Sequence, residues 1–406
     1  MRAGDRGRRP RLLTWVFARV MLVNFGYFLS LGIMNPVLPR YIAGPLGGSN
    51  LAVGFGVGSF TIVSLLLRPW SGRFGDRSGR KKGIVLGAFA HTFGTLGMVV
   101  ANSLGQVIAF RMLTGIAEAF LFVGASTAAQ DLAPDDRRAE AASLFSVSLF
   151  SAIAIGPAIG ETLLDNFGYD TVWLVAAAVV GLGALVALTL PDTRTEEMVA
   201  EPPTDAPLIH RAALRPGFPL ACAIWGLAAF NSFVPLYATK DLGLPGARTV
   251  ILANAGTILV LRLFFGRLPD RIGPLRAARM ALIFSPAGLA VMGLWAEIPG
   301  LYVGAVLLAV GQAFAFPSLM TMAVNNAPAS ERGSVMGTFT AFFDLSFGGG
   351  AIVLGAVANA LGYNGAFLAA MCVALVGTAT LFFAPPPQRR VTGPSRPMVQ
   401  INPPGE

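Results

Sequence analysis

Long apolar stretches, separated by short polar segments, run through almost the whole chain. Each stretch is about as long as the roughly 20 residues that a helix needs to cross the hydrocarbon core of a bilayer. The pattern predicts twelve membrane-spanning helices, over residues 14–39, 51–71, 83–102, 105–129, 141–163, 171–190, 218–239, 248–268, 277–296, 300–322, 333–357 and 363–384. The sequence therefore predicts an all-α membrane protein.

Three polar segments flank or interrupt these stretches. Residues 1–13 are rich in arginine, residues 191–217 in proline, glutamate and threonine, and residues 385–406 in proline and arginine. Such compositions favour flexible chain, although a folded insert at 191–217 is an alternative. The expected organisation is two six-helix bundles, over 14–190 and 218–384, joined by one linker and flanked by two tails.

The composition agrees with a membrane protein. Hydrophobic residues make up 54% of the 406 residues and charged residues only 13%, against about 25% charged residues in a soluble domain. The net charge is +9, but Lys and Arg recur in short clusters between the apolar stretches rather than along one face. This distribution favours orientation in a membrane over binding to nucleic acid.

The positions of Lys and Arg predict which loops face the cytoplasm. With the N-terminus inside, 23 of the 30 basic residues fall in the tails, the linker and the inner loops, whereas the outer loops hold only Arg40, Lys240 and Arg248. Lys and Arg are enriched in cytoplasmic loops. We therefore expect a multi-pass protein of the plasma membrane with both termini, and the 191–217 linker, in the cytoplasm.

Two parts of the chain repeat each other at a nearly constant spacing. The segment RPWSGRFGDRSGR, which begins at Arg68, matches RLFFGRLPDRIGP, which begins 194 residues later at Arg262. An offset kept over six helices indicates duplication of a six-helix unit, which predicts two pseudo-symmetric halves. The same offset, or one of 196 residues near the start of each half, pairs Asn35 with Asn231, Tyr41 with Tyr237, Pro134 with Pro328 and Gly168 with Gly362.

The first copy of this segment resembles the loop signature of the major facilitator superfamily, G-x-x-x-D-R-x-G-R-R/K. The matching positions, between the second and third predicted helices, are Gly72, Asp76, Arg77, Gly79, Arg80 and Lys81. The second copy keeps Gly266, Asp270, Arg271 and Gly273 but lacks the basic pair that follows. The resemblance covers the chain from about Ala18 to Ala384.

This resemblance implies a secondary transporter with a central cavity between its halves. It also implies that the duplicated loops form a cytoplasmic gate, in which the Asp76 carboxylate takes charge-assisted bonds from the facing half. A positively charged loop with no special role is the alternative.

The fifth predicted helix contains AIAIGPAIGE, residues 152–161. It resembles the antiporter signature of drug exporters, G-x-x-x-G-P-x-x-G-G, at Gly156, Pro157 and Gly160. It departs from that signature at Ala152 and Glu161, where the family has glycine. Small residues with a proline predict a kinked, closely packed helix that would seal the two halves together, and packing without any role in transport direction is the alternative.

Charged side chains inside the predicted helices are candidates for function, because a charge at membrane depth must be paired, hydrated or protonated. Glu118 lies in the fourth helix and Asp344 in the eleventh. Arg111 matches the family's second motif, R-x-x-x-G-x-x-A, seven residues before Glu118. A proton- or substrate-binding role is one interpretation, and a structural Arg111–Glu118 ion pair is another.

The family resemblance implies that the first, fourth, seventh and tenth helices line the cavity. Polar residues on these helices, Asn35, Asn231 and Gln312, are therefore further candidates for contact with substrate. Gln312 occupies the position that the repeat pairs with Glu118. Most intramembrane amides form interhelical hydrogen bonds, which is the structural alternative.

No sequence feature indicates an enzyme or a bound cofactor. Cys222 and Cys372 lie within apolar stretches, and no Walker sequence, zinc-ligand spacing or nucleophile elbow is present. We therefore expect no metal, no cofactor and no nucleotide hydrolysis.

The preferred functional prediction is proton-coupled export of a lipophilic drug or metabolite by a monomeric transporter. Its expected partners are a small-molecule substrate, protons and the lipid bilayer. Proton-coupled uptake, or facilitated transport of a nutrient such as a sugar or organic acid, is the rival. A membrane sensor would need an appended soluble domain, and none is predicted.

Overall fold

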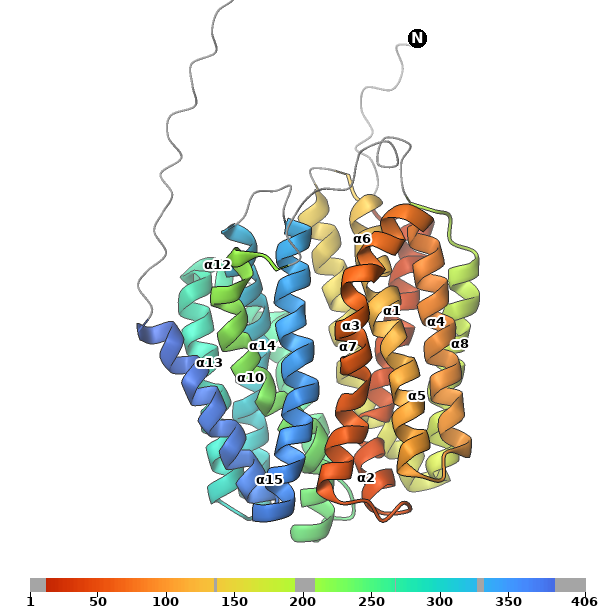
Figure 1. Cartoon of the computed structure of the whole chain (residues 1–406). Coiled ribbons are helices and arrows are strands. Elements are labelled where there is room, and N and C mark those ends of the chain that lie inside the picture. The colour runs from red at the N-terminus through yellow and green to blue at the C-terminus, as the bar shows by residue number, and fades with distance from the viewer. Residues whose placement is uncertain (1–11, 135–136, 194–208, 267, 327–331, 384–406) are drawn as a thin grey trace, which may run out of the picture.

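The computed structural model describes residues 12–134, 137–193, 209–266, 268–326 and 332–383. Every regular element in these ranges is a helix (Figure 1). Residues 1–11 of the expected N-terminal tail, the expected tail over 385–406 and most of the expected linker lie outside the described residues.

The first half contains α-helices that run mostly from one end of the molecule to the other. Two short segments complete them, the 3₁₀ turn Met98–Val100 and the π-helix Glu118–Phe122. The α-helices are α1 (Trp15–Met34), α2 (Val37–Ala43), α3 (Asn50–Ser78), α4 (Arg80–Gly97), α5 (Leu104–Ala117), α6 (Val123–Asp131), α7 (Arg138–Phe167) and α8 (Tyr169–Leu188).

The second half repeats this arrangement, with a π-helix over Tyr237–Asp241. Its first helix begins at Arg211, because the His210 side chain accepts a hydrogen bond from the Ala212 N–H and starts the helix. The expected start at 218 was therefore too late. The α-helices are α10 (Arg211–Leu236), α11 (Arg248–Phe265), α12 (Leu268–Ile272), α13 (Pro274–Leu294), α14 (Ile298–Asn325) and α15 (Arg332–Phe383).

Twelve membrane-spanning helices follow from these bounds. Within the described residues, eleven helical segments are long and apolar enough to cross a bilayer. The last of them, α15, has 52 residues and would be about 78 Å long, but its backbone is non-helical at Gly362, with φ 72°. Residues 332–361 and 363–383 are thus two spans, and the predicted all-α fold is confirmed.

The two copies share the same unusual backbone positions, which confirms the duplication. All six residues with positive φ in the described chain are glycines, and they form three pairs at the offsets found in the sequence. These glycines make the turns between helices, where other residues would be strained. The pairs are Gly47 with Gly243, Gly79 with Gly273, and Gly168 with Gly362.

An aromatic cluster is also repeated in the two halves. Tyr41 contacts Tyr169 and Trp173, with ring centroids 5.0 and 5.6 Å apart. The equivalent residues of the second half are Tyr237, Tyr363 and Phe367, with centroids 6.3 and 5.4 Å apart. Each cluster joins the end of the first membrane span of its half, over Trp15–Ala43 or Arg211–Asp241, to the last span of that half.

Helices α3 and α15 lie side by side where the two halves meet (Figure 1). A Cβ atom placed on Gly58 of α3 would lie only 2.5 Å from the carbonyl oxygen of Gly348 of α15. Glycine at both positions therefore allows the two backbones to approach closely, as small residues do in membrane helix pairs.

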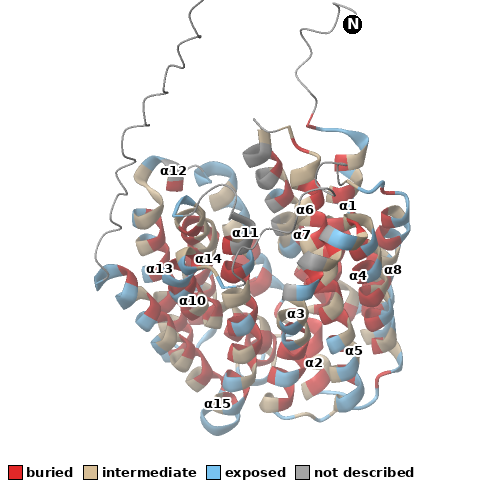
Figure 2. Cartoon of the chain, turned by 45° about the horizontal axis from the view of Figure 1, so that its top comes forward, coloured by how far each residue is buried: buried red, intermediate tan, exposed pale blue. Residues whose placement is uncertain are grey.

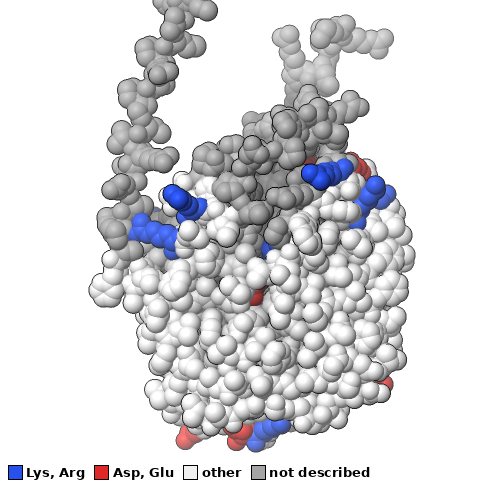
Figure 3. Space-filling view, in the orientation of Figure 1, with Lys and Arg blue, Asp and Glu red and all other residues white. Residues whose placement is uncertain are grey.

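The surface has a charged end and an apolar middle. Lys and Arg gather at one end, which we call the basic end (Figure 3). Helix α3 ends there with Arg77, α12 ends there with Arg271 in its last turn, and α13 begins there with Arg276 near its start. Below it lies a band with almost no charge. Figure 2 shows buried residues between the helices and exposed residues on their outer faces, where large apolar side chains such as Leu182 and Phe93 are exposed. A lipid solvent accounts for that surface.

Candidate functional site: an ion-pair network between the two halves

Four helical segments bring polar side chains together in the interior. Tyr27 comes from α1, Arg68 from α3, Glu118 from the π-helix that follows α5, and Asp344 from α15. A π-helix changes the register of side chains within a helix and is frequent at functional sites. The network thus combines residues that lie far apart in the chain, and it includes both acids that the sequence predicted as candidates.

Arg68 joins the two acids across the boundary between the halves. Its Nε and Nη2 atoms both lie 2.5 Å from Asp344 Oδ2. Its Nη2 atom also lies 3.5 Å from Glu118 Oε1, and its Nη1 donates a 2.9 Å hydrogen bond to Thr340 Oγ1. One guanidinium therefore contacts an acid of each half.

Two hydroxyl groups complete the network. Tyr27 donates a hydrogen bond to Glu118 Oε2, and Ser64 donates one of 3.3 Å to Asp344 Oδ2. Tyr27, Ser64, Glu118 and Asp344 are all buried. The hydroxyl donors supply part of the hydrogen bonding that water would otherwise provide to the carboxylates.

The network lies well inside the apolar part of the helices. Counting 1.5 Å per residue, Asp344 is about 18 Å along α15 from Arg332 at the basic end, and Glu118 is about 21 Å from Leu104 at the opposite end. A hydrocarbon core of about 30 Å would enclose both acids. These are therefore charges in a region where they are expensive.

Arg111 does not pair with Glu118, so the alternative interpretation as a structural ion pair is wrong. The Arg111 guanidinium donates hydrogen bonds of 3.2 Å to the backbone carbonyls of Gly56 and Val57, and it lies 4.4 Å from the Phe60 ring centroid. Seven residues separate Arg111 from Glu118 by about 10 Å along the helix. The α3 backbone lies nearer to Arg111 and takes its hydrogen bonds.

The three amide candidates lie apart from this network. The backbone N–H of Asn35 caps the end of α1. The Asn231 amide donates a 3.1 Å hydrogen bond to Leu227 of its own helix and lines a small cavity with Pro36 and Pro157. Gln312 lies on α14, where its Nε2 atom is buried and has no hydrogen-bond partner in the described part of the chain. Their contact with substrate stays a prediction.

The glycines of the fifth-helix motif act mainly within the first half. A Cβ atom on Gly156 would lie 2.6 Å from the Cα of Gly32 on α1, and one on Gly160 would meet the Ile33 carbonyl. The expected seal between halves was therefore wrong for these two glycines, because they pack α7 against α1. Pro157 alone of the motif lines a cavity with the second half.

The duplicated signature is helical rather than a loop. Helix α3 continues to Ser78 and α4 begins at Arg80, so Gly72, Asp76 and Arg77 lie in α3 and Gly79 alone makes the turn. The expected end of this helix at residue 71 was therefore too early.

Arg80 acts within the first half. Its Nε atom lies 3.3 Å from Asp131 Oδ2, and its backbone N–H donates to Asp192. Arg271 lies in the last turn of α12 and is exposed. The side chains of Asp76 and Asp270 lie outside the described residues, so their gating role stays a prediction.

A second ion cluster lies at the end opposite the basic end. Arg40 Nη1 lies 2.7 Å from Glu161 Oε2 and 3.6 Å from Asp165 Oδ1. Gly246, between the π-helix Tyr237–Asp241 and α11 of the second half, lies against these charges, because a Cβ atom there would lie 3.4 Å from Glu161 Oε2. We call this the Arg40 cluster. Among the described residues, no three His, Cys, Asp or Glu side chains could share a metal ion.

Sequence reasoning missed Arg68 and Tyr27 as members of the network. Arg68 begins the duplicated segment, and Ser64 precedes it by four residues, which places both on one helix face. That spacing was the available signal for Arg68. Tyr27 gives no comparable signal, because a tyrosine in an apolar helix is usually part of the core.

This arrangement of twelve membrane-spanning segments in two repeated halves, with charged residues buried between them, is that of a polytopic membrane protein. The sequence model described as Major Facilitator Superfamily matches residues 20–294 and 249–403. The chain belongs to the Major Facilitator Superfamily, and this membership indicates a transporter rather than an enzyme.

Individual similar proteins support this family assignment. The chain is 29% identical over 379 residues to an uncharacterised MFS-type transporter of Salmonella typhimurium, covering 89% of this chain and 95% of that one. Its fold is similar to that of a POT family transporter crystallised with a thioalcohol-conjugated peptide (TM-score 0.75, 15% identity, 90% and 95% coverage). It is also similar to the human organic anion transporter MFSD10 (TM-score 0.71, 16% identity, 90% and 98% coverage).

Proposed function

We propose that this protein exports a lipophilic drug or metabolite in exchange for protons, by alternating access. The observation that carries the proton coupling is the contact of one arginine, Arg68, with two buried acids, Glu118 and Asp344. The two acids belong to different halves of the molecule.

The charges of this network favour the uptake of a proton. Two carboxylates and one guanidinium leave one negative charge in excess, and an uncompensated charge buried in an apolar region is costly. Protonation of one acid removes this charge. Asp344 is the better candidate for the proton, and Glu118, held by Tyr27, is the better candidate for contact with substrate.

Protonation and conformation are linked because the network crosses the boundary between halves. The Arg68–Asp344 contact holds α3 to α15, and a neutral Asp344 would hold Arg68 less strongly. If the halves move apart on one side, the occupancy of the proton site biases that movement. A solute bound between the halves would experience the same bias.

The orientation follows from the charge distribution. We assign the basic end to the cytoplasm, because Lys and Arg are enriched on that side of membrane proteins, and both termini with it. Reporter fusions at residues 80 and 271 are expected to be cytoplasmic, and a fusion at residue 243 external. Reporters at 80 and 271 on opposite sides of the membrane would contradict this assignment.

Transport in proteoliposomes tests the function. Purified protein is reconstituted, and a panel of lipophilic drugs, metabolites and sugars is assayed with a pH gradient imposed in each direction. Movement of a lipophilic compound in the direction opposite to proton flow supports export. Movement of a sugar or organic acid together with protons, without drug movement, would replace export by uptake.

A further inference from the structure

A buried histidine lies beside the tyrosine of the ion-pair network. His91 of α4 is fully buried, and its ring contacts that of Tyr27 in a T-shaped arrangement, with centroids 4.9 Å apart. Its Nε2 atom lies 3.1 Å from the hydroxyl of Ser30, which is also buried. Tyr27 in turn donates a hydrogen bond to Glu118. The contacts thus form one chain, from Ser30 through His91 and Tyr27 to Glu118.

Helix α4 packs closely on the segments that carry Glu118. A Cβ atom on Gly87, one turn before His91, would lie 2.6 Å from the backbone nitrogen of Leu121 in the π-helix. One on Gly94, just beyond His91, would lie 2.8 Å from the Phe110 carbonyl oxygen of α5. Glycine at both positions lets the backbones approach closely. The position of His91 relative to the π-helix is therefore fixed on both sides.

The hydrogen bonding of His91 favours a positioning role over the transfer of protons. Its Nδ1 atom is buried and has no hydrogen-bond partner in the described part of the chain. A proton on Nδ1 would have no acceptor there, so the neutral ring carries its proton on Nε2 and donates it to Ser30. The chain of hydrogen bonds ends at this ring, and its remaining contact is with Tyr27.

The internal repeat shows that helix packing alone does not require this chain. The equivalents of its four residues in the second half, in the order of the sequence, are Ala223, Gly226, Ser285 and Gln312. There the same two helices pack through apolar groups, since a Cβ atom on Gly226 would lie 3.1 Å from Leu289 Cδ1 of α13. Tyrosine, histidine and the acid thus occur together in one half, at positions where the other half has none of them.

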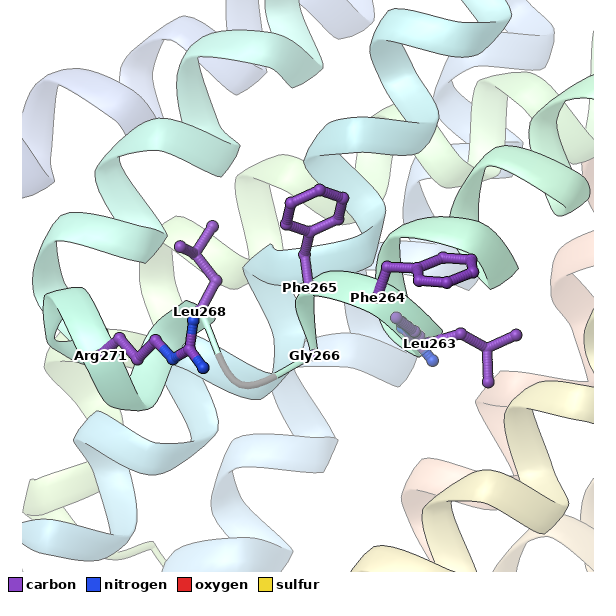
Figure 4. A pocket seen from close by; sticks show the side chains of 7 residues that line it. Leu263, Phe264, Phe265, Gly266, Leu268 and Arg271 are labelled. Atoms are coloured by element: carbon purple, nitrogen blue, oxygen red, sulfur yellow. The ribbon is translucent and has the colours of Figure 1, made fainter.

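A cavity of the second half does not take the place of this chain. It has a volume of about 410 Å³ and lies at the junction of α11 and α12. Figure 4 shows Leu263, Phe265 and Arg271 of its lining pointing in different directions. None of the four equivalent residues lines it. The difference between the halves therefore concerns the surroundings of Glu118.

We propose that His91 is a positioning residue for Glu118 and acts through Tyr27. Ser30 orients the His91 ring, that ring confines the ring of Tyr27, and the Tyr27 hydroxyl holds the Glu118 carboxylate. Without His91, the Tyr27 ring gains free space and its hydroxyl spends less time on Glu118. The carboxylate then loses a donor that favours its charged form. This role deepens the function proposed above, and its importance for transport rests on that function.

Labelling of Glu118 with dicyclohexylcarbodiimide tests this role without a transport substrate. The apolar reagent adds to protonated carboxyl groups, and the labelled peptide is quantified by mass spectrometry after reaction of the full chain in phosphatidylcholine nanodiscs at neutral pH. Tyr27→Phe should raise the labelling rate about tenfold or more, the value of a hydrogen bond to a charged group. His91→Ala should give part of this increase. His91→Phe, which keeps an aromatic ring against Tyr27, should stay nearer to wild type.

A double variant separates positioning from a direct effect on the acid. In the Tyr27→Phe background, His91→Ala should raise the labelling no further, because the hydroxyl on which it acts is already absent. Thr95→Ala is the matched control. Thr95 is also buried on α4, but its hydrogen bond goes to Met34 of α1, seven residues beyond Tyr27. This variant should label like wild type.

The charged groups that act on Glu118 from the neighbouring helices, Arg68, Arg111 and Asp344, are unchanged in all these variants. Unchanged labelling in Tyr27→Phe would overturn the proposal, and so would wild-type labelling in His91→Ala or an increase that adds to that of Tyr27→Phe. If His91→Ala fails to fold, Ser30→Ala takes its place with the same expected outcomes.

The positioning role and the export function fail separately. The labelling needs neither a substrate nor a pH gradient, so it reports on Glu118 alone. Wild-type protein that shows this labelling pattern but no pH-driven transport would refute the proposed export and leave the role of His91 standing. Normal export with wild-type labelling in His91→Ala would have the opposite meaning.

Discussion

The network around Arg68 and the Arg40 cluster have the same composition, two acids and one arginine, but different surroundings. Arg68 is 10% exposed and its acids, Glu118 and Asp344, are 11% and 4% exposed in their side chains. In the Arg40 cluster, Asp165 is 41% exposed. The excess negative charge of that cluster is therefore hydrated, whereas the excess charge between the halves is buried away from water. The same residue types thus leave an excess charge that is buried in one place and hydrated in the other.

The two clusters also differ in how they join the halves. Arg68 reaches Asp344 of the second half with its side chain. All three charged members of the Arg40 cluster belong to the first half, and the second half approaches them with the backbone around Gly246. We therefore expect substitutions between the halves to change coupling, and substitutions in the Arg40 cluster to change stability slightly.

The largest expected effect on transport is the loss of coupling. Asp344→Asn and Glu118→Gln should each fold, because one acid remains to pair with Arg68, yet Asp344→Asn should lower pH-driven export at least about tenfold, a change of about 1.4 kcal/mol or more. Substrate counterflow, which needs no proton gradient, should persist. Asp170→Asn, a carboxylate near the opposite end, is the matched control. Full pH-driven export by both variants would show that neither acid carries the proton.

Removal of the arginine should destabilise the protein most. Arg68→Gln leaves two buried acids without their cation, and breaking a buried ion pair in this way costs about 3–5 kcal/mol. Adding Asp344→Asn should restore part of that loss, since only one buried acid then remains. Thermal unfolding of the single and double variants in detergent measures this coupling. Additive losses would mean that Arg68 and Asp344 do not interact.

An intermediate effect is expected when both acids of the Arg40 cluster are neutralised. Glu161→Gln with Asp165→Asn leaves Arg40 without a carboxylate, and a loss of about 1–2 kcal/mol is expected, because Arg40 is 18% exposed and partly hydrated. The same unfolding assay gives the value. A loss as large as that of Arg68→Gln would remove the distinction between the two clusters.

The smallest effect is expected for the single substitutions there. Asp165→Asn should change stability by at most about 0.5 kcal/mol, since exposed ion pairs contribute little. Glu161→Gln should cost no more than about 1 kcal/mol, because Arg40 keeps Asp165 within reach. Neither should alter pH-driven export. Loss of export in Glu161→Gln with normal folding would assign the Arg40 cluster a role in coupling after all.

The candidate site was only partly predictable. Glu118 and Asp344 were found because a carboxylate is conspicuous within an apolar helix. Arg68 was not ranked with them, since arginine near the expected end of a helix can extend toward the membrane surface. Its role depends on α3 continuing to Ser78, which places Arg68 in the interior. Gly156 and Gly160 of the fifth-helix motif were assigned the wrong neighbour, because small residues predict close packing but do not say which helix packs against them.

The sequence alone determined the number of spans, the duplication and the membership of a transporter family. These depend on local hydrophobicity and on spacings along the chain, which need no knowledge of the partner helices. Only the tertiary structure decided that Arg68 pairs with both acids, that Arg111 binds the α3 backbone, and that Gly156 packs on α1. Each of these is a contact between helices distant in the chain, and a periodic apolar pattern fits many such pairings equally well. The structure selects among them by the close approach of backbones and the pairing of buried charges.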